Sequence, residues 1–411
     1  MGLVAKSAPH FKPLNKLSQI IANEIEIAGK ISFARFCELA LYCPVYGFYE
    51  KEGDNIGRDG DYYTSVSVGP LFGELLGFQM AQWLRRCDRC EGPLKIVEAG
   101  AHDGELARDI LNWFREFAAD LYEGIEYWIV EPSPARQQWQ QRTLRDFEGK
   151  VFWAKEVASL GACARRPALD CSRQAEDSLA LPSPGAPASN CSKSAESSIR
   201  GVIFCNELLD AFPRHRVGWD AKKREWFEWG VGVEAERFAW MRLDGGASGA
   251  ALVPGLPSEL LSVLPDGFTT EVCPLAEEWW QQAAGTLACG KLVAIDYGLD
   301  AEEFFAPNRS QGTLRSYRKH QLSGDVLAEP GEQDITAHVN FTAIQDAGEG
   351  AGLRTEMFVS QEQFLTGIVA NVLKRPGGFG EWTSKHARQL QTLIHPEHLG
   401  RAFRVLVQSR E

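Results

Sequence analysis

Residues 94–111 read LKIVEAGAHDGELARDIL, which is a short apolar run, a turn with two glycines and an amphipathic segment. The run 94–98 has the length of a buried strand, and residues 105–117 repeat apolar side chains at helical spacing. A second apolar run, IEYWIVE (125–131), follows, and Pro134 is placed to open another helix. The order strand, turn, helix, strand predicts the first unit of a parallel α/β sheet.

Later apolar runs continue the same sheet. We expect its further strands near residues 151–153, 201–205, 291–296 and 401–408. Between them, the alternating stretches HRVGW, EWFEWGVGV and FAWMRL predict an antiparallel excursion of two or three strands. The fold class is therefore α/β, with an antiparallel lobe inserted into a mostly parallel sheet.

The residues before this sheet predict helices and one long loop. Apolar residues at helical spacing between 14 and 25 stop at Gly29, and Ser32 is placed to cap a second helix. Residues 46–69 are dense in Gly, Asp and Tyr and predict a structured loop, after which Pro70 opens a further helix.

Composition and charge exclude several classes of protein. Hydrophobic residues at 44% and charged residues at 24% are ordinary globular values, so collagen-like and wholly disordered structure are excluded. The net charge of −12 repels a phosphate backbone, and we expect no nucleic-acid partner. No run approaches the roughly 18 apolar residues of a spanning helix, and the start MGLVAKSAPHFKPLNK has no apolar signal core. We therefore expect a cytoplasmic protein without membrane insertion.

The cysteines predict reduced thiols and no metal site. Ten cysteines are scattered without the dense, even spacing of a secreted disulfide framework. Cys87 and Cys90 form one CxxC pair, but no second pair and no nearby HxxxH completes a zinc set.

The turn within residues 97–106 is a candidate ligand site. Gly100 and Gly104 follow a buried strand, where they let the backbone bend sharply and let a ligand approach closely. Glu131 ends the next strand, a position at which an acidic side chain can accept both hydroxyls of a ribose. These residues favour a nucleoside-containing cofactor, a dinucleotide or S-adenosylmethionine, over a plain turn with a helix-capping carboxylate. The dinucleotide fingerprint G-x-G-x-x-G is incomplete here.

The block CNELLDAFP (205–213) is a second candidate, because it comes directly after an apolar strand. Asn206, Glu207 and Asp210 place one amide and two carboxylates within five residues, and ligands bind beyond the carboxyl ends of strands in doubly wound sheets. Ordinary surface polarity explains any one of these side chains, but three of them beside a strand end predict a pocket.

Eight blocks spread over most of residues 30–345 point to a known family. They are FARFCELALYCPVYGFY (33–49), GDYYTSVSVGPLFGELLG (60–77), VEAGAHDGELARDIL (97–111), IVEPSPARQQWQ (129–140), NELLDAFP (206–213), IDYG (295–298), GTLRSYRKH (312–320) and PGEQDITAHVNFT (330–342). In this order they resemble the MidA family, whose mitochondrial member is the arginine methyltransferase that helps to assemble respiratory complex I. So many ordered blocks make the match more specific than any single motif.

The resemblance implies a Rossmann-like class I methyltransferase with a mostly parallel seven-stranded sheet, which uses S-adenosylmethionine to methylate a protein arginine. It further implies a partner protein of the respiratory complex I type. The residues that it assigns to the cofactor are Gly100 and Gly104 beneath the methionine part, Glu98 at the ammonium, Glu131 at the ribose, and Thr64, Phe72 and Gly73 closing the site from the N-terminal side.

With this resemblance, the chain divides into four expected parts. They are an N-terminal helical segment with a cofactor-covering loop (1–90), the cofactor-binding core (91–213), an inserted substrate-binding lobe (214–290) and the completion of the core sheet with a substrate loop at 312–342 (291–411). Within the core, residues 159–199 are rich in Ser, Ala and Pro and predict a flexible insertion.

The chemistry of the acceptor agrees with the carboxylates. Arginine keeps its proton at neutral pH, so carboxylates are needed to orient the guanidinium and to accept a proton as the new bond forms. Glu207 and Asp210 are the candidates, with Asn206 as a hydrogen-bond acceptor, and a lysine or amide nitrogen is compatible with the same residues. The later block supplies His320, Asp334, Thr336 and His338 to a loop that we expect to cover the substrate.

Three features depart from the family pattern. His102 stands where methyltransferases commonly have a glycine and could crowd the cofactor, Asn340 stands where an aspartate is expected, and the composition of residues 159–199 is unusual. Two other functions stay open: an assembly or scaffold protein that keeps the cofactor fold without turnover, and a nicotinamide-dependent oxidoreductase, which the incomplete glycine fingerprint disfavours.

Overall fold

The computed structural model describes residues 15–51, 64–87, 92–160, 199–244, 247–253, 256, 258–318, 321–375 and 377–411. Several expectations from the sequence lie outside these residues. They are residues 52–63 of the loop at 46–69, nearly all of the insertion at 159–199, Cys90 and His320.

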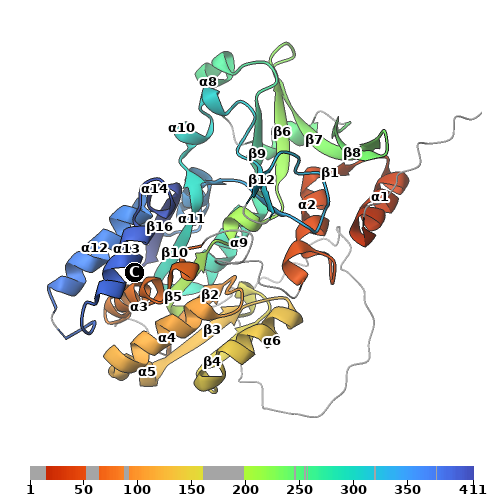
Figure 1. Ribbon diagram of the computed structural model, residues 1–411. Helices are drawn as coiled ribbons and strands as arrows, with labels where there is room; N and C mark the ends of the chain where they lie inside the picture. Colours follow the sequence, from red (N-terminus) through yellow and green to blue (C-terminus); the bar gives the residue numbers. More distant parts are fainter. Residues whose placement is uncertain are drawn as a thin grey trace, which may run out of the picture.

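The core is a sheet whose main path has the strand order β15-β16-β10-β5-β2-β3-β4 (Figure 1). From β10 to β4 all neighbours are parallel, whereas β16 is antiparallel to both of its neighbours. This confirms the mostly parallel seven-stranded sheet, to which a short eighth strand, β14 (Val339–Asn340), adds beside β10. The strands are β2 (Leu94–Ala99), β3 (Ile125–Val130), β4 (Val151–Ala154), β5 (Ile199–Asn206), β10 (Leu287–Leu299), β15 (Arg354–Ser360) and β16 (Phe403–Arg410).

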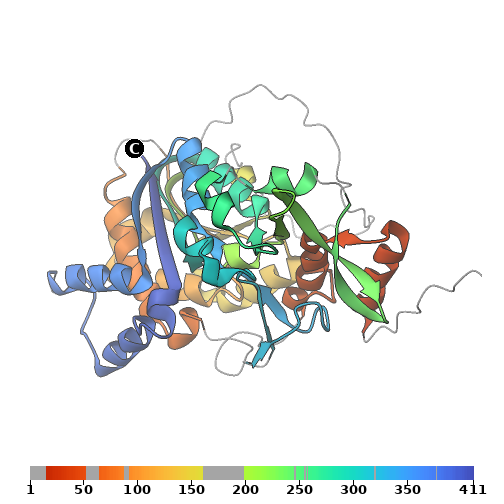
Figure 2. The same ribbon diagram turned by 90° about the horizontal axis from the view of Figure 1, so that it is seen from above.

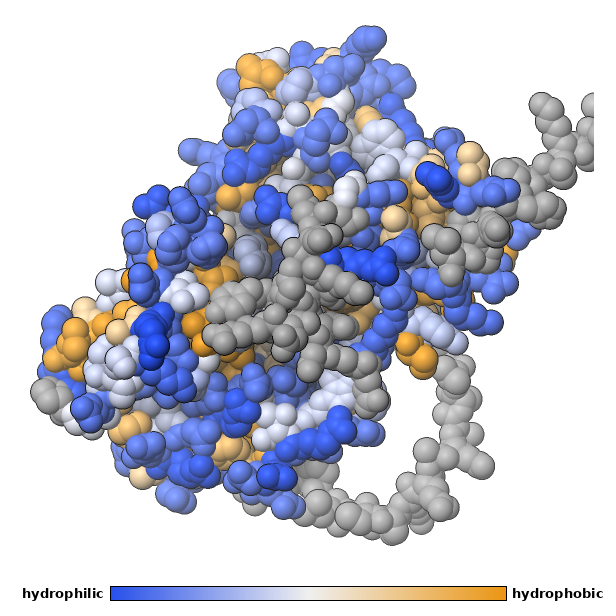
Figure 3. All heavy atoms as spheres, viewed as in Figure 1, coloured by the Kyte–Doolittle hydropathy of each residue, from blue (hydrophilic) through white to orange (hydrophobic). Residues whose placement is uncertain are grey.

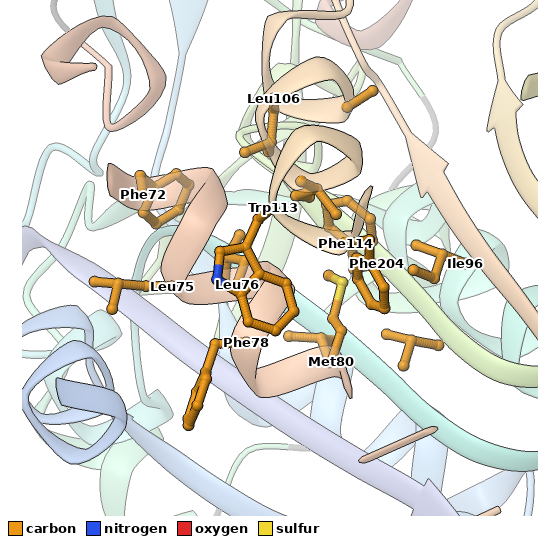
Figure 4. Packing of buried hydrophobic residues seen from close by; sticks show 14 of the residues in the cluster. Phe72, Leu75, Leu76, Phe78, Met80, Ile96, Leu106, Trp113, Phe114 and Phe204 are labelled. Carbon is orange, nitrogen blue, oxygen red and sulfur yellow. The ribbon is translucent and has the colours of Figure 1, made fainter. Parts of the chain in front are cut away.

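Helices cover both faces of this sheet, because successive strand side chains point to opposite faces. Ile96 of β2 packs into a cluster with α3 (Leu71–Leu84), α4 (Glu105–Phe117), α12 (Gln361–Leu373) and α13 (Ser384–Leu393). Val97, the next residue, packs into the opposite cluster with α9 (Pro274–Thr286) and α11 (Phe341–Gly350). Figure 4 shows Trp113 of α4 beside Leu76 and Phe78 of α3, with 6.0 Å between the ring centroids of Phe78 and Trp113. The shorter helices of the core are α5 (Ala119–Gly124), α6 (Pro134–Thr143), α10 (Ala301–Phe304) and α14 (Leu399–Ala402).

The inserted lobe is a five-stranded sheet that also includes a strand from the N-terminal segment. Its order is β1-β7-β6-β9, and β8 also pairs with β7. Rings of α2 pack on β8, with centroid distances of 4.8 Å from Phe33 to Trp240 and 5.7 Å from Phe36 to Phe238. The N-terminal helices and the lobe therefore form one body at the end of the molecule opposite α12 and α13 (Figure 2). The elements are α1 (Lys16–Ala28), β1 (Ile31–Ser32), α2 (Phe33–Tyr42), β6 (His215–Asp220), β7 (Glu225–Glu234), β8 (Arg237–Arg242), α7 (Ala247–Leu252), α8 (Ser258–Val263) and β9 (Thr269–Val272).

A small third sheet lies within the predicted substrate loop. Its order is β12-β11-β13, with β11 (Arg315–Arg318) between β12 (Gln321–Ser323) and β13 (Asp334–Thr336). Short 3-10 helices join the larger elements elsewhere. They are η1 (Phe48–Glu50), η2 (Val66–Val68), η3 (Arg145–Phe147), η4 (Val157–Leu160), η5 (Leu209–Ala211) and η6 (Pro307–Arg309).

Capping residues start and end the helices where the sequence predicts. The Oγ of Ser32 accepts the backbone N–H of Arg35 at 3.1 Å and caps α2, and the Oγ of Ser133 caps α6 with Pro134 at its first position. Gly29 ends α1 with φ of 78°, a conformation that glycine adopts without steric cost.

Among the described residues, the large exposed apolar side chains are spread over several segments, with Val45 and Tyr46 as neighbours. They include Ile27, Val45, Val263 and Leu373, which belong to four different segments. The face in Figure 3 is accordingly mostly hydrophilic, with apolar groups scattered over it. Among the helices of the described ranges, none combines the length and apolar content that crossing a bilayer needs.

The middle of the core sheet requires a glycine at one position. Gly201 has φ of 142°, and an added Cβ would lie 2.0 Å from the backbone oxygen of Lys95 on β2. We expect Gly201→Ala to lower the free energy of unfolding by about 3 kcal/mol, because neither neighbouring strand can move away without breaking its ladder. Urea unfolding followed by tryptophan fluorescence measures this. Gly124→Ala is the control, since its Cβ meets nothing within 4 Å; equal midpoints for the two variants would contradict the prediction.

Candidate active site

The carboxyl ends of four neighbouring strands form the site. Because β3, β2, β5 and β10 are parallel, the residues that follow them meet at one edge of the sheet. The register places Ala99 of β2 opposite both Val130 and Cys205, and Ile295 of β10 opposite Asn206. The glycine turn, Glu131 and the acidic block after β5 are thus brought together, as the sequence predicts.

The turn after β2 bends toward the acidic block. Gly100 has φ of 76°, and an added Cβ would lie 2.9 Å from Cδ1 of Leu208. Gly104, with φ of 89°, stands at the N-cap of α4, so the first backbone N–H groups of that helix face this turn. His102 also has a positive φ, of 47°; its carbonyl accepts Nε2 of Gln140 at 2.9 Å. The side chain of His102 lies beside Asp103, 3.7 Å from Nδ1 to Oδ1.

Glu131 is held in place by hydrogen bonds at the end of β3. It is 2% exposed, and its Oε1 accepts the backbone N–H of Ser133 at 3.0 Å while Oε2 accepts Nε2 of Gln140 at 3.2 Å. Burial raises the pKa of Glu131, and the charge of Arg136 opposes that rise. Each carboxylate oxygen keeps lone-pair capacity, so the side chain can accept the two hydroxyls of a ribose. These residues therefore fit a nucleoside.

The other predicted cofactor residues have structural partners of their own. Oε2 of Glu98 accepts the hydroxyl of Tyr127 at 2.6 Å, and burial raises the pKa of Glu98 to about 7. The hydroxyl of Thr64 accepts the N–H of Ser67 at 3.1 Å. Phe72 is fully buried in the core cluster (Figure 4), and a Cβ on Gly73 would lie 2.6 Å from Cβ of Asp109. Packing accounts for Phe72 and Gly73, and a role at the cofactor stays a prediction for these residues.

The turn after β5 holds two buried polar atoms that lack a hydrogen bond of good geometry within the described residues. Glu207 has φ of 52°, and its N–H donates to the carbonyl of Ile295 at 2.9 Å. Nδ2 of Asn206 donates to Oε1 of Glu207 at 3.1 Å. Among the residues that the structure describes, Oδ1 of Asn206 and Oε2 of Glu207 are buried without a hydrogen bond of good geometry, although the backbone N–H of Ser65 acts on the Glu207 carboxyl and opposes the rise of its pKa. Buried oxygens without a well-formed hydrogen bond are uncommon in folded proteins, so each calls for a ligand or water.

Two further carboxylates lie behind this turn. Asp210 hydrogen-bonds Asp296 through its side chain, and Oδ2 of Asp296 accepts the backbone N–H groups of Leu209 at 2.8 Å and Asp210 at 3.3 Å. Burial and the charge of Asp210 raise the pKa of Asp296 far above the usual range. The pair therefore holds a shared proton at neutral pH.

Arg214 fixes the other side of the turn. It is 3% exposed, and its guanidinium donates to the carbonyls of Phe212 at 3.1 Å, Ala337 at 2.9 Å and, more closely, Asp210. Sequence reasoning missed Arg214 and Asp296. Asp296 lies in the family block IDYG (295–298). A single aspartate after an apolar run does not indicate in the sequence that it will contact Leu209 and Asp210.

The pKa of the Glu207 carboxyl is strongly raised. Burial raises the pKa of Glu207 to about 8, and the charges of Asp210 and Asp334 add to this effect, while the hydrogen bond from Asn206 opposes it. Within the described ranges, no three His, Cys, Asp or Glu side chains are arranged as metal ligands. The cluster is therefore best described as a set of hydrogen-bond and proton acceptors.

The later block contributes one of its residues to this cluster. Asp334 is 1% exposed, its charge acts on Glu207, and its Oδ1 accepts the hydroxyl of Tyr49 at 2.7 Å. Thr336 pairs with Arg315 across β13 and β11 and is partly exposed. The roles of both in substrate binding stay predictions.

His338 and Asn340 belong to a separate pocket next to Arg214. They line it together with Glu271 of β9. Burial and the positive charges of nearby arginines lower the pKa of His338 to about 4, so the imidazole is neutral at neutral pH. Oδ1 of Asn340 accepts the N–H of Ala343 at 3.3 Å and caps α11. Asn and Asp are similarly good N-caps, which explains why an amide can stand at this position.

Comparison with known proteins gives a family and several relatives. Residues 75–359 match the model of the family described as "Putative S-adenosyl-L-methionine-dependent methyltransferase". The chain belongs to this family. It is 29% identical to the protein arginine methyltransferase NDUFAF7, mitochondrial, of Danio rerio (79% of this chain, 70% of the relative) and 26% identical to that of Homo sapiens (83% and 71%). A crystal structure from Burkholderia thailandensis with bound S-adenosyl-homocysteine is 29% identical, with a TM-score of 0.75 over 96% of this chain and 92% of that one.

These comparisons confirm the resemblance, the fold and the cofactor. The chain is a methyltransferase that uses S-adenosylmethionine, and the glycine turn with Glu131 fits this cofactor. The open choice between S-adenosylmethionine and a dinucleotide is therefore decided, and the nicotinamide-dependent alternative is dropped.

The expected cytoplasmic location is wrong, because the curated relatives are named as mitochondrial proteins. The sequence argument looked for long apolar segments. Mitochondrial targeting segments are amphipathic and basic rather than apolar, so the lack of an apolar core bears only on secretion and membrane insertion.

Glu131 tests the cofactor site of this methyltransferase. We expect Glu131→Gln to weaken S-adenosyl-homocysteine binding about ten-fold or more, because hydrogen bonds to a charged group contribute about 1.5–3 kcal/mol each. Isothermal titration measures the affinity, and a thermal unfolding scan checks that the variant is folded. Glu126→Gln on the same strand is the matched control, since its carboxylate accepts Trp128 Nε1 away from the carboxyl end. Unchanged affinity in Glu131→Gln would exclude the ribose role.

Proposed function

We propose that this methyltransferase transfers a methyl group to a guanidinium nitrogen of an arginine in a partner protein. Two observations support the proposal. The relatives in zebrafish and man are named protein arginine methyltransferases. The block after β5 presents buried carboxylate and amide oxygens beside the turn predicted to hold the cofactor, at Gly100 and Leu208.

The single observation that carries the proposal is a pair of buried oxygens, Oδ1 of Asn206 and Oε2 of Glu207, that lack a hydrogen bond of good geometry within the part of the chain that the structure describes. Both atoms are hydrogen-bond acceptors, and a guanidinium is a planar donor with five N–H groups and no acceptor. A cationic donor would satisfy both oxygens at once and would offset the charge of the buried carboxylates.

The bound cofactor supplies an electrophilic methyl group on a sulfonium sulfur. The residues of this chain position the acceptor and handle its proton. Glu207 and Asn206 orient the guanidinium, and Glu207 takes the proton that the nitrogen loses as its bond to carbon forms. A carboxylate with its pKa near 8 is a stronger base than an ordinary one, so in its ionised form it accepts the proton more readily.

Asp210, Asp296 and Asp334 have supporting roles in this proposal. Asp210 and Asp296 hold the turn and, with their shared proton, carry less charge than two free carboxylates would. Asp334 adds negative potential at Glu207, which favours a cationic acceptor over a neutral one. This distinguishes arginine and lysine from an amide nitrogen.

A protein substrate requires a surface that receives it. We propose that the lobe and the loop 312–342 form this surface. The division of the chain into four parts, one of them a substrate-binding lobe, belongs to the same proposal. The respiratory complex I type of partner implied by the resemblance also belongs to the proposal, and it is supported by the name NDUFAF7 of the relatives. The scaffold alternative differs in one respect, since it requires no methyl transfer.

The transfer itself is tested with a labelled methyl group. Incubation of the protein with methyl-labelled S-adenosylmethionine and a cell extract is followed by hydrolysis and mass spectrometry, and we expect labelled methylarginine. Glu207→Gln should lower kcat about 100-fold or more, because it removes the proton acceptor and leaves the shape of the site. Cofactor affinity should stay unchanged.

Glu228→Gln is the matched control for loss of a buried carboxylate. Glu228 is 6% exposed and contacts Nδ1 of His215 at 2.6 Å on the lobe sheet. This variant should keep most of the transfer rate. Label on lysine or on an amide would overturn the arginine assignment, and a folded, cofactor-binding protein that transfers no label would favour the scaffold.

The pH dependence follows from Glu207. Below its pKa of about 8 the carboxyl group is protonated and cannot accept a proton, so kcat/KM should rise with pH up to about 8 and then level off. Asp210→Asn removes a charge that raises this pKa and should move the break to lower pH. Measurement of kcat/KM between about pH 6 and about pH 9, for the wild type and for Asp210→Asn, tests this dependence. A flat wild-type profile would exclude Glu207 as the base.

A further inference from the structure

The 3-10 helix η1 lies between the predicted ribose site and the acidic cluster. On one side, Oε2 of Glu50 accepts the hydroxyl of Ser133 at 3.0 Å, and the N–H of Ser133 donates to Oε1 of Glu131 at 3.0 Å. Glu50, a residue of the N-terminal segment, is therefore linked through Ser133 to Glu131, the carboxylate predicted to bind the ribose.

A second connection runs through Arg136. Its Nε and Nη2 both donate to the backbone carbonyl of Tyr49 at 3.1 Å, and the guanidinium lies 5.1 Å from the centroid of the Tyr49 ring. Nη1 of Arg136 is 3.9 Å from Oε2 of Glu131. Arg136 is well buried, with 12% of its side chain exposed, so these charge interactions are only weakly screened by solvent.

On the other side, η1 contacts the acceptor end of the site. The hydroxyl of Tyr49 donates to Oδ1 of Asp334 at 2.7 Å, and Nζ of Lys51 donates to the carbonyl of Gly331 at 2.7 Å. Asp334 in turn acts electrostatically on Glu207. A series of contacts thus leads from Glu131 to Asp334, whose charge acts on the proposed proton acceptor.

We propose that Tyr49 is a positioning residue that couples the two halves of the site. It orients Asp334 toward the acceptor, and its own place is set by Arg136 and by the Glu50–Ser133 contact at the cofactor. The inference rests on the proposed function, because it takes the acidic cluster as the acceptor site. A ribose bound at Glu131 stabilises η1, and η1 then holds Asp334 in position for the guanidinium.

Coupling of this kind is reciprocal. If the cofactor stabilises the position of Asp334, a change at Asp334 must alter cofactor affinity by the same free energy. The acceptor is therefore not needed for the test, and S-adenosyl-homocysteine serves as the probe. The carboxylate of Asp334 is not among the residues predicted to contact the cofactor, so an effect on affinity has to be transmitted.

The experiment is a double-mutant cycle on Tyr49 and Asp334, with S-adenosyl-homocysteine affinity measured by isothermal titration. We expect Tyr49→Phe and Asp334→Asn each to weaken binding about five-fold, which is the lower end of coupling between sites. The double variant should also be about five-fold weaker, because both changes break the same contact; independent effects would multiply to about 25-fold. Asp334→Ser replaces Asp334→Asn if the asparagine variant does not fold.

Tyr42→Phe is the matched control. The rings of Tyr42 and Tyr49 lie 5.5 Å apart, but the hydroxyl of Tyr42 donates to the carbonyl of Ala211 at 2.9 Å. The factor by which Tyr42→Phe weakens S-adenosyl-homocysteine binding should multiply with that of Asp334→Asn in the double variant.

Two outcomes would overturn the coupling: affinity within two-fold of the wild type in Asp334→Asn, or effects of Tyr49→Phe and Asp334→Asn that multiply. Arginine methylation would stand in either case. Conversely, loss of labelled methylarginine from the transfer assay would overturn the proposed function without changing the result of this cycle.

Discussion

The site depends on the buried carboxylate of Asp296, which ties the end of β10 to the turn after β5. Its Oδ2 accepts the N–H groups of Leu209 and Asp210, and its Oδ1 accepts that of Tyr297 at 2.8 Å. A carboxylate away from water is costly unless it is hydrogen-bonded, so displacing the turn would leave several buried groups unpaired at once. The left-handed conformation of Glu207 is held by these tertiary contacts, against its own backbone preference. The geometry of the acceptor oxygens follows from that constraint.

The N-terminal segment contacts both the lobe and the core. The aromatic rings of α2 anchor it to β8 of the lobe, and the chain then continues into η1, where Tyr49 and Glu50 contact the core at Arg136 and Ser133. The lobe and the edge of the core sheet thus contact a common element. In the proposed function, this element lies between the methyl acceptor and the cofactor.

Some site residues could be predicted from the sequence and others could not. Glu131 and Glu207 stand directly after apolar runs, and the end of a parallel strand is a recognisable position in a linear sequence. Phe72 and Gly73 are less clear from their position in the sequence. Their block resembles a cofactor segment, and in the structure Phe72 is buried in the core cluster and Gly73 lies against Asp109 of α4, so a role at the cofactor stays a prediction. His338 is close to Asp334 in sequence and is predicted to act with it; it lines the pocket beside Arg214 directly before β14, and its role in substrate binding stays a prediction.

The sequence by itself predicted six strands of the core sheet, the capping of α2 and α6, and a candidate nucleoside-binding turn, whereas it gave no sign of β15 or of the helices α11 to α13. Each of these predictions follows from local periodicity or from a side chain that bonds its own neighbourhood. Only the tertiary structure decided that Asp296, Arg214 and Tyr49 belong to the site. Tyr49 and Asp334 are 285 residues apart, and Asp296 and Leu209 are 87 apart. Contacts over such separations leave no periodic signal, because they form only when the burial of both sheets brings the segments together.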